Sequence, residues 1–179
     1  LIQEGKIKCW GISEVNEDYL RRAHKVCPVT VIQNRYSMLA RGHEKMFPIC
    51  EELGITFVAF SPIANGFMSG AYNEKSQFNE KGDYRASMPQ FKEAGFKSAE
   101  QLMEELKQIA DQKKATLAQI SLAWIINKHH NCIPIPGSRK VSRLEENFHA
   151  GDIVLTPEEI KQIDNLLDKA DIPVFGVNQ

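Results

Sequence analysis

Apolar, β-branched runs alternate with helix-like segments along most of this 179-residue chain, and this alternation limits the folds open to it. Four runs are predicted to be strands: 7–12, 29–34, 56–60 and 132–135. Six segments with helical spacing or capping residues are predicted to be helices: 17–26, 43–53, 98–113, 117–129, 141–148 and 157–169. Strands that are apolar on both faces belong to parallel sheets covered by helices, so we expect an α/β fold.

Two parallel architectures fit this alternation. A doubly wound nucleotide-binding fold usually carries a Gly-x-Gly-x-x-Gly turn after its first strand, whereas this chain has Gly11-Ile12-Ser13-Glu14 there. The alternative is a (β/α)8 barrel, which needs eight strands. We therefore expect a partial (β/α)8 TIM barrel, a half-barrel of four parallel strands with surrounding helices, the strands adjacent in chain order.

The first residues have the pattern of a helix end. The segment 1–6 includes Gly5, a residue type that closes helices, but no helix start precedes it. The basic and then apolar stretch of a signal peptide is not found there either. We therefore expect the chain to begin partway through a larger fold.

Composition excludes several classes of function. The chain is 42% hydrophobic and 25% charged with a formal net charge of −1, which is ordinary for a soluble protein and argues against a nucleic-acid binder. No apolar run is long enough to span a bilayer. Its four cysteines form no CxxC pair, so we predict no metal site, reduced thiols and a cytoplasmic location: Cys9, Cys27, Cys50 and Cys132.

A long interruption separates the third predicted strand from the next predicted helix. Residues 61–97 are rich in Gly, Pro, Asn and Ser and show no sustained period. Long irregular loops inside compact domains are usually functional. Within this loop, 73–95 carries many small or charged residues and few to bury, so we expect it to be mobile without a ligand.

The carboxyl ends of the predicted strands carry polar, aromatic and basic residues, and ligands of such barrels bind at those ends. Ser13 and Gln33 are able to hydrogen-bond a carboxamide, and the Phe60 ring suits stacking on a flat heteroaromatic ring. The loop 136–140 supplies basic residues before a helix start, which suits a phosphate. Each feature alone is more often structural; together they indicate a nucleotide site with an additional phosphate.

Four segments resemble the aldo-keto reductase family. Residues 5–13 and 31–37 are similar to its fifth and sixth strands. Residues 59–70 are similar to its seventh strand with the cofactor loop, and 133–147 to its eighth strand with the adenosine-phosphate loop. The resemblance covers essentially the whole chain. It implies that 1–179 is the carboxy-terminal half of one barrel domain, with a long loop at about 61–97.

The resemblance also implies an NADP site. Ser13 and Gln33 would hold the nicotinamide carboxamide, and Phe60 would stack on the ring. The pyrophosphate would be lined by Ser61, Pro62, Ile63, Gly66, Ser69 and Gly70. The 2′-phosphate loop and the adenine contacts would be Gly137, Ser138, Arg139, Arg143, Glu146 and Asn147. Many members have Asn where this chain has Glu14. The Glu14 carboxylate accepts a hydrogen bond from the carboxamide NH₂ but, unlike Asn, has no hydrogen to donate.

No catalytic residue is assigned. The family's acid–base chemistry uses an Asp, Tyr, Lys and His on its first four strands, which this resemblance does not include, and His129 and His130 precede the last predicted strand, at the opposite end of the barrel. The implied function is NADPH-dependent reduction of aldehydes or ketones, with this chain as the cofactor-binding half. The alternative is a non-catalytic NADP-binding or self-associating half-barrel module.

The expected partners follow from both alternatives. They are a small-molecule carbonyl substrate and either a missing amino-terminal half-barrel or a second copy bound through the open sheet edges. The sequence names no particular carbonyl substrate, because much of that pocket would belong to the other half of the barrel.

Overall fold

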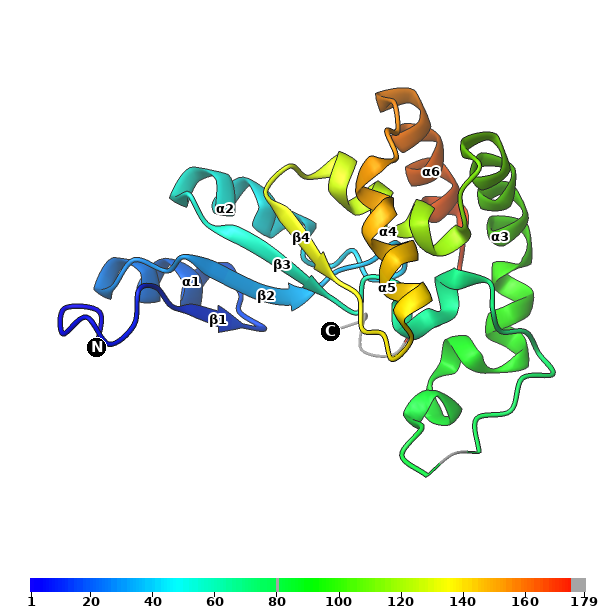
Figure 1. Ribbon diagram of the computed structural model, residues 1–179, viewed down its shortest axis with the longest axis horizontal. Coiled ribbons are helices and arrows are strands. Elements are labelled where there is room, and N and C mark those ends of the chain that lie inside the picture. Colours follow the sequence, from blue (N-terminus) through cyan, green and yellow to red (C-terminus); the bar gives the residue numbers. More distant parts are fainter. Residues whose placement is uncertain (80, 175–179) are drawn as a thin grey trace.

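A computed structural model describes residues 1–79 and 81–174. Its four strands are β1 (Gly11–Ser13), β2 (Val31–Arg35), β3 (Thr56–Phe60) and β4 (Cys132–Ile135). They form one sheet in the order β1-β2-β3-β4, and every neighbouring pair is parallel (Figure 1). The predicted half-barrel of four parallel strands, adjacent in chain order, is therefore confirmed.

The first strand is shorter than predicted. Residues 7–10 lie outside it, although the Trp10 carbonyl still accepts from the Thr30 amide at 3.0 Å. The predicted helix end at the start of the chain is confirmed: Gly5 has a φ of 68°, its amide donates to the Ile2 carbonyl at 2.9 Å, and the Lys6 amide donates to the Leu1 carbonyl at 3.0 Å, which is the Schellman pattern of a helix C-terminus. β1 is an edge strand paired with β2 alone, so a single neighbour decides where its ladder begins.

Helices follow the strands, and short 3-10 turns join them. The α-helices are α1 (Glu17–Val26), α2 (Phe47–Leu53), α3 (Glu93–Lys113), α4 (Leu117–Lys128), α5 (Val141–Phe148) and α6 (Pro157–Lys169). The 3-10 helices are η1 (Glu44–Met46), η2 (Ala64–Ser69), η3 (Tyr84–Ser87), η4 (Pro89–Phe91) and η5 (His149–Asp152).

Local signals account for most helix ends. Asn16 caps α1 by accepting from the Tyr19 amide at 3.0 Å, and Thr116 and Thr156 open α4 and α6 with complete capping boxes. Gly54 closes α2 in the left-handed conformation. These ends depend on residues next to each other in the chain, and for this reason they are visible in the sequence.

The start of α3 was predicted wrongly. The spacing of Ser98 and Gln101 fits a capping box and predicts a helix start at 98. Both residues instead lie inside the helix, because α3 already begins at Glu93. Gly95, a poor helix former, is buried there against the backbone of Gln90. A methyl group on Gly95 would lie 2.5 Å from the Gln90 carbonyl oxygen, so only glycine allows this close approach. The helix start thus depends on a tertiary contact.

Aromatic side chains from the segment between β3 and α3, and from the first turn of α3, pack together. Five rings form an aromatic cluster: Phe67, Tyr72, Phe78, Phe91 and Phe96. Phe78 joins it with its ring centroid 5.0 Å from that of Phe91 and 5.3 Å from that of Tyr72. Of these rings only Phe78 and Phe91 lie within 73–95, and most described residues of that range are exposed or half-buried, so the expected mobility there stays a prediction.

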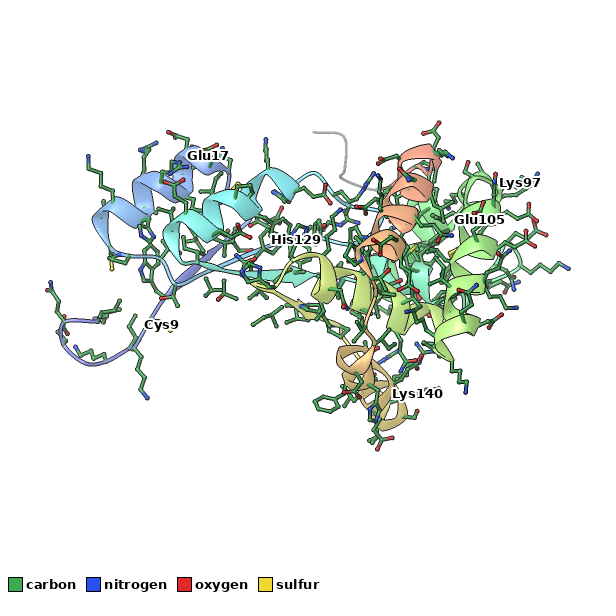
Figure 2. All side chains as sticks on the ribbon, turned by 90° about the horizontal axis from the view of Figure 1, so that it is seen from above. Cys9, Glu17, Lys97, Glu105, His129 and Lys140 are labelled. Carbon is green, nitrogen blue, oxygen red and sulfur yellow. The ribbon has the colours of Figure 1, made fainter. Side chains whose placement is uncertain are left out.

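Only one face of the sheet is covered by helices. Ile32, Phe57 and Ala59 point to the covered face and are fully buried, and Figure 2 shows α1 and α2 lying along this side. On the other face, Ile133 and Ile135 of β4 remain 54% and 43% exposed. β1 and β4 each pair on one side only. The sheet of the described residues therefore offers one open face and two edges to further polypeptide.

The contact at Gly95 gives the first prediction. Gly95→Ala should lower the free energy of unfolding by about 1–3 kcal/mol, because the clash with the Gln90 backbone outweighs the helix propensity of alanine. Gly151→Ala is the control, since a methyl group there meets nothing within 4 Å. Urea unfolding of both variants tests this; a Gly95→Ala protein as stable as its parent would contradict it.

Candidate functional site

The ends of β1 and β2 are tied together by hydrogen bonds. The Ser13 hydroxyl donates to the Gln33 carbonyl at 2.8 Å, and the Glu14 amide donates to the same oxygen at 3.0 Å. Glu14 has a φ of 50°, and its carboxylate accepts from the Arg35 amide at 2.9 Å. Glu14 thus extends the pairing of the two strands by one side-chain contact, a role that the sequence did not suggest.

Asn34 has a structural role. Its amide group is completely buried, accepts from the Val15 amide at 3.2 Å and donates to the Val15 carbonyl at 2.9 Å. His43 Nδ1 lies 3.1 Å from the same amide nitrogen. Asn34 therefore fixes the chain that leaves β1, while its neighbour Gln33 projects to the exposed face of the sheet beside Ser13. Of these two adjacent amides, only Gln33 faces a possible ligand.

The chain leaves β3 through a tight, left-handed turn. Phe60 ends the strand half-buried, opposite Ile135 of β4. The Ser61 carbonyl accepts from the Ala64 amide at 2.9 Å, and the Ser69 hydroxyl donates to the Gly66 carbonyl at 2.6 Å. Several residues of this turn have positive φ: Ser61, Ala64, Asn65, Gly66 and Gly70.

One glycine of this turn combines a left-handed backbone with a close side-chain contact. Gly70 has a φ of 69°, and a methyl group there would lie 2.7 Å from Leu117 Cδ1 of α4. The end of the turn 61–70 therefore packs closely against Leu117 at the start of α4.

The basic loop before α5 has no side-chain cap at the helix start. Lys140 occupies the N-cap position without a capping hydrogen bond, and Ser138 accepts from the Lys140 amide at 3.3 Å. Arg139, Lys140 and Arg143 are all exposed. Helix N-terminal amides beside three cations favour an anion, so these residues fit a phosphate group. Figure 2 shows Lys140 projecting away from α1 and α2.

Glu146 has partners inside the protein. Its carboxylate accepts from the Thr116 hydroxyl at 2.6 Å, and its carbonyl accepts from Gln119 Nε2 at 3.0 Å. Both partners lie at the start of α4, so Glu146 joins α5 to α4. Its predicted contact with adenine, together with that of Asn147, stays a prediction.

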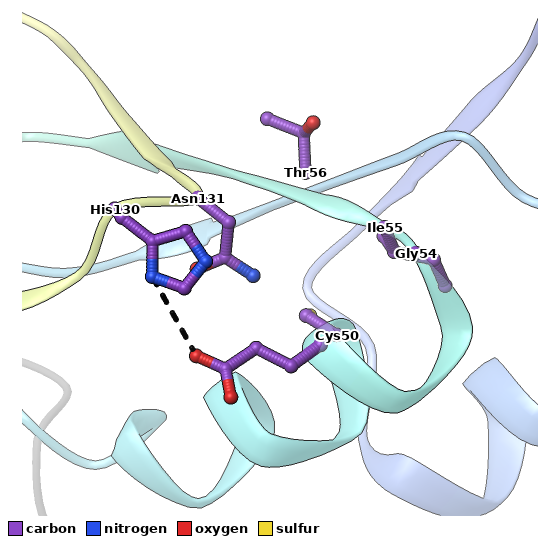
Figure 3. Close-up of a pocket in the computed structure, with 7 residues that line it drawn as sticks. Cys50, Gly54, Ile55, Thr56, His130 and Asn131 are labelled. Atoms are coloured by element: carbon purple, nitrogen blue, oxygen red, sulfur yellow. Dashed lines mark ion pairs between the residues drawn. The ribbon is translucent and has the colours of Figure 1, made fainter.

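The predicted residues gather at one end of the sheet. Because all four strands are parallel and in register, Ser13, Gln33 and Phe60 all lie near their carboxyl ends. Figure 1 shows the arrowheads pointing to the side where the loop before α5 lies. A cavity of about 320 Å³ lies instead at the amino ends of β3 and β4 (Figure 3), where His130 Nδ1 is 3.9 Å from Glu51. That cavity is separate from the predicted site.

A polar cluster lies on the side of the sheet that the helices cover; its members are Tyr36, Glu44, Lys128, His129 and Asp164. The Tyr36 hydroxyl donates to Glu44 at 2.8 Å and lies 3.1 Å from His129 Nε2. Lys128 Nζ contacts Glu44 at 2.8 Å and Asp164 at 3.0 Å. These residues are far apart in the chain, and no pattern in the sequence predicted that they meet.

The phenol and the carboxylate of this polar cluster have pKa values shifted in opposite directions. Tyr36 is fully buried, and burial together with the nearby Glu44 carboxylate raises the pKa of its phenol far above the ordinary value of about 10. Burial alone would raise the pKa of Glu44, but hydrogen bonds from Lys128 and Tyr36 lower it. The cluster joins α4 and α6 to the side of the sheet that the helices cover.

Within 1–79 and 81–174, no group of three or more His, Cys, Asp or Glu side chains is placed to hold a metal ion. No helix in those residues is both long and apolar enough to cross a membrane. All four cysteines are free thiols in the structure, and burial raises the pKa of Cys50 to about 11 and of Cys132 to about 12.

Comparison with known proteins identifies the family. Residues 1–168 match the model of the aldo/keto reductase family, and the chain belongs to that family. It is 37% identical over 177 residues to aldo-keto reductase str7 of Strobilurus tenacellus, covering 97% of this chain and 52% of that protein. It is 34% identical over 175 residues to aldo-keto reductase yakc [NADP(+)] of Schizosaccharomyces pombe, covering 96% and 51%. The chain thus spans about half the length of these curated relatives.

Solved structures agree on the fold. A glycerol dehydrogenase from Gluconobacter oxydans superposes with a TM-score of 0.86 at 24% identity, over 94% of this chain and 51% of that chain. An aldo-keto reductase from Klebsiella pneumoniae in complex with NADPH gives 0.68 at 23% identity, over 93% and 50%. These likenesses establish the architecture of the sheet and its helices.

The polar cluster generates a pH prediction. Burial and the adjacent Lys128 lower the pKa of His129 to about 4, while Glu44 and Asp164 partly oppose the shift and His130 adds to it. Between pH 6.5 and 4 the unfolded chain therefore binds more protons than the folded one, so stability falls as pH falls through this window. The slope should stay below the one-proton limit of about 1.4 kcal/mol per pH unit, because the ring is only half-buried.

Urea midpoints measured from pH 4 to 7 test this prediction. His129→Gln should flatten the slope, whereas His130→Gln, at the neighbouring and largely exposed position, should change it much less, because His130 contributes least to the shift at His129. An unchanged slope in the His129 variant would show that other groups cause the acid sensitivity.

Proposed function

We propose that this chain is the coenzyme-binding half of an NADPH-dependent oxidoreductase that reduces an aldehyde or ketone carbonyl. The observation that carries the proposal is the gathering of Ser13, Gln33, Phe60 and the basic loop at the carboxyl end of one parallel sheet. This is the end where barrels of this kind bind their ligands. Membership of the aldo/keto reductase family supports the reaction class.

The nicotinamide end of the coenzyme would lie over β1 to β3. Gln33 is exposed on the uncovered face and would hold the carboxamide, with the Ser13 hydroxyl as an acceptor because its proton is given to the Gln33 carbonyl. Phe60 would stack on the ring. Glu14 is engaged with the Arg35 amide, so its part would be to hold Ser13 and Gln33 in place.

The phosphate end would lie between two loops. The turn 61–70 would line the pyrophosphate, and Arg139 and Arg143 would hold the 2′-phosphate beside the start of α5. The uncapped helix start and the exposed cations support this assignment, because both favour an anion. The yakc relative, which is named for NADP(+), supports the choice of coenzyme.

The part of this chain in catalysis would be binding and orientation. NADPH, when bound, supplies the hydride, and the resulting alkoxide needs a proton from a positioned acid. We assign that acid to the other half of the barrel. Tyr36, which has Lys128 and His129 near it, is withdrawn from solvent behind the sheet.

The coenzyme assignment leads to a prediction about Arg143. In the complete protein, Arg143→Ala should weaken NADPH binding by about 10- to 100-fold, through loss of charge-assisted hydrogen bonds, and leave NADH binding nearly unchanged. The control is Arg22→Ala, which removes an exposed guanidinium on α1 that pairs with Asp18 at 3.4 Å. Fluorescence titration with both coenzymes measures the effect; equal losses for both would refute the assignment.

The open sheet suggests what completes the site. At the β4 edge, Val141, Leu144 and Phe148 of α5 are 71%, 52% and 80% exposed, at spacings that place them on one side of the helix. Val26 at the end of α1, the helix that follows β1 in the chain, is 89% exposed. The two unpaired sheet edges and these exposed apolar side chains support the proposal that four further strands with their helices close the barrel.

Residues 1–179 purified alone should reduce no carbonyl. We expect no NADPH oxidation with a reactive aldehyde, because the proton donor would be missing. Light scattering should show self-association, because both edges and the apolar side of α5 would be exposed. Turnover that co-purifies with a monomer would contradict both expectations. NADPH binding without turnover, by a natural protein of only this length, would favour the alternative of a binding module.

A further inference from the structure

The predicted pyrophosphate turn contains three consecutive left-handed residues. Ala64, Asn65 and Gly66 have φ values of 47°, 61° and 91°. Ala64 carries a Cβ that disfavours this conformation, and such a backbone persists only where its surroundings hold it. The contacts around the turn therefore determine whether it keeps the shape that lets backbone approach a ligand.

Two tyrosines contact adjacent residues of this turn. Asn65 Nδ2 donates to the Tyr84 hydroxyl at 3.1 Å. Asn65 Oδ1 is buried and has no partner among 1–79 and 81–174, so Tyr84 makes the one hydrogen bond found there for this side chain. At Gly66, an added methyl group would lie 3.2 Å from Tyr72 Cε2, so the Tyr72 ring packs directly on the glycine.

Arg85 fixes the ring of Tyr72. The guanidinium lies over it, 4.8 Å from the centroid, and Nη1 donates to the Tyr72 hydroxyl. Asp83 holds Arg85 in turn: its two carboxylate oxygens accept from Nε at 2.9 Å and from Nη2 at 2.6 Å. The side chains of Asp83 and Arg85 are only 11% and 23% exposed. This bidentate pair is therefore sheltered and geometrically defined.

We propose that Asp83, Tyr84 and Arg85 are positioning residues for the coenzyme pyrophosphate. Tyr84 acts on Asn65 directly, and Arg85 acts on Gly66 through Tyr72. Together they hold the left-handed turn in its binding shape before the coenzyme arrives. The proposal rests on the proposed function, since it assigns a role within that same site.

The charges distinguish this unit from the phosphate-binding arginines. The carboxylate of Asp83 neutralises Arg85, so the guanidinium is engaged in holding the loop. Hydrogen bonding from Arg85 lowers the pKa of Asp83, and the charge of Arg139 lowers it further. The unit thus lies within electrostatic reach of the basic loop as well as beside the turn. Its effect should fall on the part of the coenzyme that NADPH and NADH share.

The test compares two coenzymes in the complete protein. Tyr84→Phe removes the hydroxyl that holds Asn65, and should raise the dissociation constants of NADPH and NADH by the same factor, about 3- to 10-fold. Tyr19→Phe is the matched control, since Tyr19 and Tyr84 are 61% and 62% exposed. The unfolding midpoint of Tyr84→Phe should equal that of the parent.

A second variant tests the sheltered pair. Arg85→Met should weaken both coenzymes by about 10-fold or more, and Arg22→Met, which removes the same charge from an exposed ion pair, should weaken neither. Should Arg85→Met fail to fold, the Tyr84→Phe comparison still decides the matter.

The outcomes separate this proposal from the proposed function. A parent protein that does not bind NADPH would refute the proposed function itself. If the parent binds NADPH and Tyr84→Phe binds both coenzymes as tightly as the parent, the positioning role is overturned. A loss confined to NADPH would also overturn it, because the defect would then lie at the 2′-phosphate.

Discussion

Parallel pairing of the four strands is the constraint on which the rest of the structure depends. Because β1 to β4 all run in one direction and in register, the residues that follow each strand are brought to the same end of the sheet. Ser13, Gln33 and Phe60 are far apart in the chain and become neighbours for this reason alone. The same pairing makes the connections long, so helices cover one face.

Covering one face leaves the other face and both edges open. The buried side of the sheet is completed by α1, α2 and α4, and by the polar cluster around Tyr36. The opposite side carries Gln33 and the exposed isoleucines of β4. The sheet thus has one face buried under helices and one face exposed to solvent. This agrees with a chain that spans about half the length of its curated relatives.

Arginines serve two different purposes near the candidate site. Arg85 is sheltered, held by both oxygens of Asp83 and stacked on Tyr72, so its charge supports the architecture. Arg139 and Arg143 are exposed in or just after a loop that leads into an uncapped helix. The guanidinium of Arg85 holds the nearby loop in place, whereas those of Arg139 and Arg143 keep hydrogen-bond donors available for an anion.

The sequence by itself determined the features that depend on near neighbours in the chain. Alternating strand and helix patterns predicted the parallel half-barrel, and Asn16, Gly54, Thr116 and Thr156 marked helix ends. Family resemblance placed the candidate coenzyme residues at the strand ends. Tertiary structure alone decided the start of α3, where Gly95 meets Gln90, and the aromatic cluster between β3 and α3. It also decided that Tyr84 and Arg85 support the turn at Asn65 and Gly66, because contacts across such separations arise only once the chain has packed.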